Sequence, residues 1–178
     1  MLKNGEKIIL YHGSYLIVEN PNLDFCNAYK DFGKGFYLTT DKKQAERFAV
    51  IVSRKKGTTT KFVNIYEFTY SNELSLKEFI YPDKEWFRFV CSNRSKKCSK
   101  LNPLTKDNDI YIGKIADDNT AIVINNFING VYGSINNEKT MNFAIKLLKT
   151  NKLTNQFCFK NDKSLKHLKF IKAEVIDD

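Results

Sequence analysis

Three short stretches of the sequence combine polar or aromatic side chains with bare backbone: Leu10-Tyr11-His12-Gly13-Ser14, Phe32-Gly33-Lys34-Gly35-Phe36-Tyr37 and Asn155-Gln156-Phe157. Glycine adopts positive φ and lets a ligand or another chain approach the backbone closely. Gly35 is followed at once by the aromatic residues Phe36 and Tyr37, which can pack or stack. A tight turn alone also explains the glycines, so the elements around them must decide between these readings.

Sequence periodicity predicts the elements that position these stretches. The β-branched and aromatic run Thr60–Tyr70 is the clearest strand. Strands are also predicted at Ile8–Tyr11, Phe36–Thr39, Ile110–Ile115, Thr154–Phe159 and Leu168–Ile176, and helices at Leu76–Tyr81, Asp83–Ser92, Thr120–Ile128 and Glu138–Lys149, with a short helix capped by Asp162. The polar segment Arg94–Asn108 is predicted to be a loop. Without a repeat or a linker, this order indicates one α+β domain over residues 1–178.

A further helix is predicted directly after the second stretch. Asp41 and Gln44 have the spacing of a capping box, and Gly57 follows a cationic C-terminal end. Ala45, Phe48, Ala49 and Val52 repeat at helical spacing and predict one apolar face. Phe48 therefore has two readings, a core residue or an aromatic surface for a ligand.

The bulk composition narrows the classes of partner. The chain has 178 residues and a net charge of +9, from 29 Lys and Arg against 20 Asp and Glu. That excess favours an anionic partner, although a lysine-rich proteome also produces basic surfaces. The four cysteines show no metal-ligand spacing, so we expect free thiols and no metal. No apolar run approaches a membrane span and no signal peptide is seen, so we expect a cytoplasmic protein without a membrane partner.

The order of the three stretches resembles the ADP-ribosyltransferase superfamily, in the branch that includes diphtheria toxin and the poly(ADP-ribose) polymerases. Within it, the chain resembles short stand-alone bacterial proteins of uncharacterised function. The resemblance is close over the first third and both ends, where Leu168-Lys169-Phe170 matches the last strand, and loose over 71–152. It implies a split two-sheet α+β core with NAD, the co-substrate, bound in a cleft.

The resemblance also implies a role for each site residue. His12 would bind the adenosine ribose, the backbone of Gly13 the nicotinamide amide, and Ser14 a nearby group. Tyr37 would stack on the nicotinamide, with Gly35 allowing that approach. The remaining implied contacts are a second stacking ring from Phe48, an amide contact at Ala45 or, with a one-residue gap, Gln44, and a pyrophosphate contact from Lys34.

Gln156 departs from the family pattern, because the polymerases carry a catalytic glutamate there. Its amide can bind the ribose 2′-OH, but it cannot take a proton, and general-base help is worth about 10²–10⁴ in rate. Chain elongation on a hydroxyl is therefore not expected, whereas single transfer to an acceptor that is already nucleophilic is. Asp109, Asp117 or Asp118 would be substitute carboxylates, although the last two also suit a helix start.

We therefore expect a mono-ADP-ribosyltransferase that uses NAD, with His12, Tyr37 and Gln156 as its catalytic residues. The alternatives are a degenerate module that binds NAD, ADP-ribose or a partner without turnover, and an NAD glycohydrolase. The basic charge favours a nucleic-acid acceptor, RNA or DNA, over a protein. Such an enzyme endangers its own cell, so we expect a bacterial or phage toxin or defence effector with a neutralising antitoxin partner.

Overall fold

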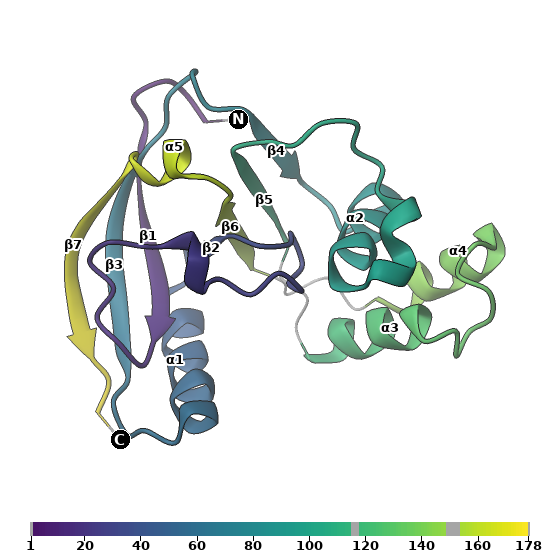
Figure 1. The fold of residues 1–178 in the computed structure, drawn as a ribbon, viewed down its shortest axis with the longest axis horizontal. Helices are drawn as coiled ribbons and strands as arrows, with labels where there is room; N and C mark the ends of the chain where they lie inside the picture. Colours follow the sequence, from purple (N-terminus) through teal and green to yellow (C-terminus); the bar gives the residue numbers. More distant parts are fainter. Residues whose placement is uncertain (1, 115–117, 149–153, 178) are drawn as a thin grey trace.

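The chain folds around one seven-stranded mixed sheet with helices beside it (Figure 1). This computed structural model describes residues 2–114, 118–148 and 154–177. The strand order is β4-β5-β6-β2-β1-β3-β7, and within the described residues only β4 and β5 pair in parallel. The strands are β1 (Lys7–Ser14), β2 (Phe36–Thr39), β3 (Phe62–Thr69), β4 (Leu76–Phe79), β5 (Ile110–Lys114), β6 (Asn155–Phe159) and β7 (Leu168–Val175). The α+β class predicted from the sequence is confirmed.

The sheet is nearly divided between β1 and β2. These two strands share a single register pair, Tyr11 with Thr39, whereas β1 and β3 pair along their whole length from Lys7 to Ser14. On the other side, β2 pairs with β6 through all four of its residues. The sheet therefore consists of the half β4-β5-β6-β2 and the half β1-β3-β7, joined at one point.

The helices lie at opposite sides of this junction (Figure 1). Helix α1 (Lys42–Lys56) packs on β1 and β3, while α2 (Lys84–Arg94), α3 (Asp118–Ile128) and α4 (Glu138–Leu147) gather near β4 and β5. The short α5 (Asp162–Leu165) precedes β7, and the 3₁₀ turns η1 and η2 span Leu23–Phe25 and Lys96–Leu101. No helix among the described residues has both the length and the apolar character needed to span a bilayer.

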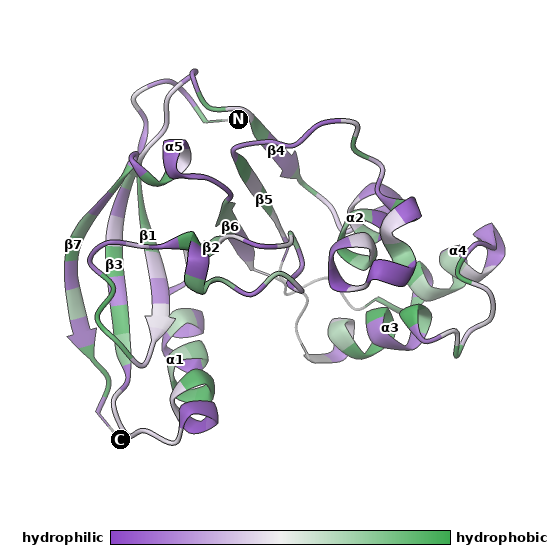
Figure 2. Ribbon diagram, in the orientation of Figure 1, coloured by the Kyte–Doolittle hydropathy of each residue, from purple (hydrophilic) through white to green (hydrophobic). Residues whose placement is uncertain are grey.

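Helix α1 begins and ends as the sequence predicts. Asp41 caps it by accepting a hydrogen bond from the Gln44 backbone N–H, and Gly57 ends it at φ +67°. Figure 2 shows hydrophobic and hydrophilic bands alternating along this helix. Its buried residues are Ala45, Ala49 and Ser53, whereas Phe48 is 43% exposed. The core reading of Phe48 is therefore wrong.

Other element predictions need correction. Leu76–Phe79 is strand β4, not a helix, because its pairing with β5 outweighs local propensity. The segment predicted as a loop contains the turn η2, which buries Cys98 and Leu101. Asn161, not Asp162, caps α5, and β1 continues past its predicted end through His12, Gly13 and Ser14.

Candidate functional site

His12 spans the gap where the β1–β2 ladder stops. Continuing the register past Tyr11 and Thr39 would place Gly13 opposite Tyr37, but no such pair forms. Instead, His12 Nδ1 donates to the Tyr37 backbone carbonyl over 2.8 Å, and its ring lies 4.5 Å from that of Phe36. Burial lowers the pKa of His12 against the raising effect of this hydrogen bond. Because Nδ1 must carry the hydrogen, neutral His12 keeps Nε2 as an acceptor.

Gly13 lacks a side chain because helix α1 occupies that space. A Cβ there would lie 2.0 Å from the Ala45 carbonyl oxygen and 2.7 Å from the Ala49 backbone nitrogen. Ala45 is buried in this contact. The bare backbone at Gly13 therefore has a packing explanation within the chain itself, and Ala45 presents its backbone to β1.

Ser14 and Asn64 hold the chain where it leaves β1. Ser14 Oγ accepts from the Leu16 backbone N–H at 3.2 Å. Asn64, fully buried on β3 opposite His12, donates to the carbonyls of His12 and Leu16 and accepts from the Val18 N–H. Asn64 is not among the site residues predicted from the sequence, although an amide inside the apolar strand β3 is an available signal.

Hydrogen bonds hold Tyr37 at its backbone carbonyl, which accepts from His12, and at its hydroxyl. Its hydroxyl donates to the Gly33 carbonyl oxygen at 2.7 Å and accepts from the Phe32 N–H at 2.9 Å. Burial raises the pKa of this phenol far above its ordinary value, so it stays neutral. Gly33, at φ +76°, supplies the turn. Gly35 makes room for β6, because a Cβ there would lie 2.4 Å from Cys158 Sγ.

Gln156 lies in the same sheet row as the β1–β2 junction. Thr39 of β2 pairs with Tyr11 on one side and with Gln156 of β6 on the other. Gln156 Nε2 donates to Asp31 Oδ2 at 3.0 Å, and Asp31 Oδ1 forms an ion pair with Arg94 at 2.6 Å. The sequence does not predict that Asp31 pairs with Arg94, because no local pattern links the two residues.

The structure thus brings the three predicted catalytic residues to adjacent strands β1, β2 and β6. Their side chains do not share one face. Successive residues of a strand point to opposite faces, so the His12 ring, stacked on Phe36, lies across the sheet from the side chain of Tyr37. Tyr37 and Gln156 share a face, because Gln156 pairs with Thr39 and Tyr37 lies two residues before Thr39 on the same strand.

The remaining predicted binding residues are placed unevenly. Lys34 is exposed at the turn. Phe48 is exposed on α1, with Lys30 Nζ 5.7 Å from its ring centroid. Gln44 Oε1 already accepts from the hydroxyls of Thr39 and Thr154, at 2.9 and 2.5 Å, so this oxygen is engaged within the protein.

Asp109, one of the expected substitute carboxylates, lies away from Gln156. It precedes Ile110, which pairs with Phe159, whereas Gln156 pairs with Gly113 near the other end of β5. Desolvation is outweighed there by hydrogen bonds from Asn161, Ser75 and Lys163, which lower the pKa of Asp109 to about 2. Asp117 lies outside the described residues, and Asp118 begins α3.

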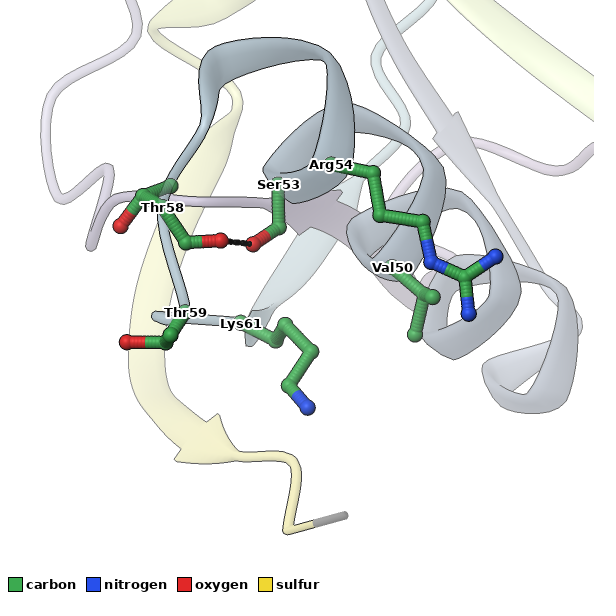
Figure 3. Close-up of a pocket in the computed structure, with 6 residues that line it drawn as sticks. All are labelled: Val50, Ser53, Arg54, Thr58, Thr59 and Lys61. Carbon is green, nitrogen blue, oxygen red and sulfur yellow. Dashed lines mark hydrogen bonds between the residues drawn. The ribbon is translucent and has the colours of Figure 1, made fainter.

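Two surface cavities lie away from these residues. Figure 3 shows one of about 200 Å³ at the C-terminal end of α1, where Ser53 donates to the Thr58 carbonyl; it is lined by Val50, Ser53, Arg54, Thr58, Thr59 and Lys61. The other, of about 270 Å³, lies against α3 and α4. All four cysteines are free thiols, and no metal-binding group of acidic, His or Cys side chains occurs among the described residues.

Comparison with known proteins gives a family without an assigned activity. Residues 8–170 match the family described as "Protein of unknown function (DUF3990)". A comparison with the curated proteins returned no match. Since the matched region covers most of the chain, the protein belongs to this family.

Proposed function

We propose that this member of the DUF3990 family is a mono-ADP-ribosyltransferase that uses NAD as its substrate. The observation that carries the proposal is the placement of His12, Tyr37 and Gln156 on the neighbouring strands β1, β2 and β6, beside the point where the sheet divides. The resemblance of the three sequence stretches to ADP-ribosyltransferases supplies the activity. The proposed core is the split type of that superfamily, with the NAD cleft at the β1–β2 junction.

The proposed chemistry asks little acid–base work of the protein. The bond between the nicotinamide nitrogen and ribose C1″ breaks, and its electron pair stays on the leaving nicotinamide. A bond from the acceptor to C1″ forms through an oxocarbenium-like transition state, and the acceptor's proton passes to water. The protein must hold the substrate and exclude water. His12 Nε2 would accept from a ribose hydroxyl, the Tyr37 ring would lie against nicotinamide, and Gln156 would orient the nearer ribose.

Phe48 is the second ring in this proposal. An exposed phenylalanine is unfavourable in water unless a ligand covers it, and Phe48 is 43% exposed. Phe48→Ala should therefore weaken NAD binding without lowering the melting temperature. Phe143→Ala is the matched control, because Phe143 is 51% exposed on α4. Equal effects of the two substitutions on NAD affinity would remove Phe48 from the site.

A nucleic-acid acceptor is proposed over a protein. Without a glutamate base, the acceptor must be nucleophilic as delivered, as base nitrogens and terminal phosphates are. Phe25 and Tyr29, which are 90% and 55% exposed before β2, offer stacking surfaces. The net charge of +9 favours a phosphate backbone. We further propose the role of a toxin or defence effector in the cytoplasm, held in check by an antitoxin.

The second candidate function is a module that binds NAD or ADP-ribose without turnover. The observation that favours it is the neutral amide of Gln156, which cannot oppose a developing positive charge as a carboxylate does. NAD hydrolysis is the third outcome. In that case nicotinamide is released but no macromolecule becomes labelled.

Incubation with labelled NAD and cell lysate separates these functions. Transfer should label a macromolecule, and nuclease but not protease should release the label. His12→Ala and Tyr37→Ala should each abolish transfer. His167→Ala is the matched control, because the Nδ1 of this second histidine also bonds a backbone carbonyl, that of Thr69. NAD binding without nicotinamide release would establish the module instead, and equal loss in His12→Ala and His167→Ala would reject the assigned site.

A further inference from the structure

A buried polar cluster supports Gln156 from behind. Gln156 and Asp31 are each 7% exposed, and they come from β6 and from the turn before β2. Gln156 Nε2 donates to Asp31 Oδ2 at 3.0 Å and to the Lys114 carbonyl oxygen at 3.4 Å. Arg94 of α2 reaches Asp31 Oδ1 through both Nε and a terminal nitrogen, at 2.7 and 2.6 Å. A carboxylate is held in the protein interior only when it is paired in this way.

These contacts determine how the amide of Gln156 is turned. Both partners, a carboxylate and a carbonyl, are acceptors, so the two hydrogens of Nε2 are used within the protein. Among the described residues no hydrogen bond uses Oε1. The opposite orientation would place Oε1 against two acceptor oxygens and leave the Asp31 carboxylate facing a lone pair. The geometry therefore leaves an acceptor oxygen, not a donor, for a ligand.

We infer that Asp31, held by Arg94, is a positioning residue that makes Gln156 a hydrogen-bond acceptor for a ribose hydroxyl of the substrate. This inference rests on the proposed function. It also explains why position 156 carries an amide. A glutamate there would set a second carboxylate against Asp31, and two carboxylates at hydrogen-bond distance cannot both ionise readily. The pair Asp31 and Gln156 thus holds one negative charge, which Asp31 carries in place of residue 156.

Exchanging the two groups tests the inference through activity. Asp31→Asn keeps the shape, but its amide group will donate to residue 156 while its oxygen faces Arg94. Gln156 must then turn over and offer Nε2 to the sugar, so NAD cleavage should fall about tenfold or more, mainly in kcat. In the double variant Asp31→Asn/Gln156→Glu, the new amide at position 31 donates to the new carboxylate at position 156, whose second oxygen is an acceptor again. Activity should recover to at least a third of wild type, and a folded double variant no better than Asp31→Asn would overturn the inference.

A second measurement does not need activity. In Gln156→Glu, the new carboxyl faces Asp31, and its pKa is raised in the fold above the unfolded value near 4.3. The folded state then holds the proton longer, so stability falls as pH rises through that value. The other groups on this face are the Arg94 cation and the weak acids Tyr37, Cys91 and Cys158, whose pKa values burial raises, so they stay neutral below pH 8.

The expected result is a melting temperature that, relative to wild type, drops by about 5 °C between pH 4.5 and pH 7 in Gln156→Glu. Asp31→Asn/Gln156→Glu should show no such drop. A pH-independent loss in Gln156→Glu, or a double variant as unstable as the single one, would refute the positioning role. If Gln156→Glu does not fold at pH 7, refolding of the double variant decides in the same way. Wild type without NAD binding or cleavage would reject the proposed function, while the melting data would still decide on Asp31.

Discussion

Gly13→Ala tests whether helix α1 needs the bare backbone of β1. The added Cβ would lie 2.0 Å from the Ala45 carbonyl oxygen, about 1.4 Å inside the 3.4 Å at which ordinary contact begins. The two atoms nearest to that Cβ, the Ala45 carbonyl oxygen and the Ala49 nitrogen, belong to the helix backbone. No change of rotamer can therefore relieve the clash, and the helix must move away from the strand. Overpacking costs about 1–3 kcal/mol, and a backbone clash belongs at the upper end. About 3 kcal/mol lowers the melting temperature of a chain this long by about 6–12 °C.

The assay is thermal unfolding followed by circular dichroism, with Gly57→Ala as the control. Gly57 has φ +67° and open space around its Cβ position, so it reports the cost of a left-handed alanine alone, about 1 kcal/mol or about 2–4 °C. Gly13→Ala should therefore melt well below Gly57→Ala. Equal melting temperatures, or a Gly13→Ala shift under about 2 °C, would show that α1 is not seated on β1 and would refute the packing argument.

Three further substitutions probe the groups around the site. His12→Asn keeps a donor for Tyr37 but cannot titrate. Because burial lowers the pKa of His12, wild type should lose stability as pH falls below about 6.5. In urea titrations at pH 7.5 and pH 5, the variant should lose less stability than wild type between the two pH values. A larger loss in the variant contradicts this. Asp109→Asn should cost about 2 kcal/mol at pH 7, with the gap closing as pH falls from 4 towards 2; a constant gap would exclude ionisation as the cause. Tyr37→Phe should destabilise the turn by about 1–3 kcal/mol, yet keep NAD affinity if the ring alone binds the nicotinamide.

Local signals in the sequence predicted most of the elements, and the failures occurred where pairing over long range decides. Asp41 and Gly57 are helix caps, whose effect depends on residues within one turn, so the sequence predicts both ends of α1. Leu76–Phe79 has no such local signal, and its pairing with β5, more than thirty residues away, makes it a strand. Phe48 fitted the helical period, but the period cannot tell which neighbours cover that face.

The candidate site depends on local and long-range signals in the same way. His12, Tyr37 and Gln156 lie in motifs that can be recognised locally, and the strand pairing places them on adjacent strands. Asp31 and Arg94 are sixty-three positions apart, and no sequence pattern predicts that they pair or that Asp31 contacts Gln156. The sequence offers Asp109, Asp117 and Asp118, at or after strand ends, as substitute carboxylates. The carboxylate that Gln156 contacts in the structure is instead that of Asp31, in the turn that precedes β2.

Residues that the fold does not need carry the most information about function. Gly13 and Gly35 are explained by contacts with α1 and β6, so their presence would be required of this fold with or without a ligand. Phe48 is held less firmly, since it is 43% exposed and Lys30 Nζ lies 5.7 Å from its ring centroid. Burying Gln156 also costs free energy, because the polar atoms of a buried amide need hydrogen-bond partners, whereas an apolar residue at that position would need none. Among the described residues, the hydrogen-bond partners of Gln156 bind its nitrogen, and we propose that a substrate hydroxyl binds the remaining oxygen.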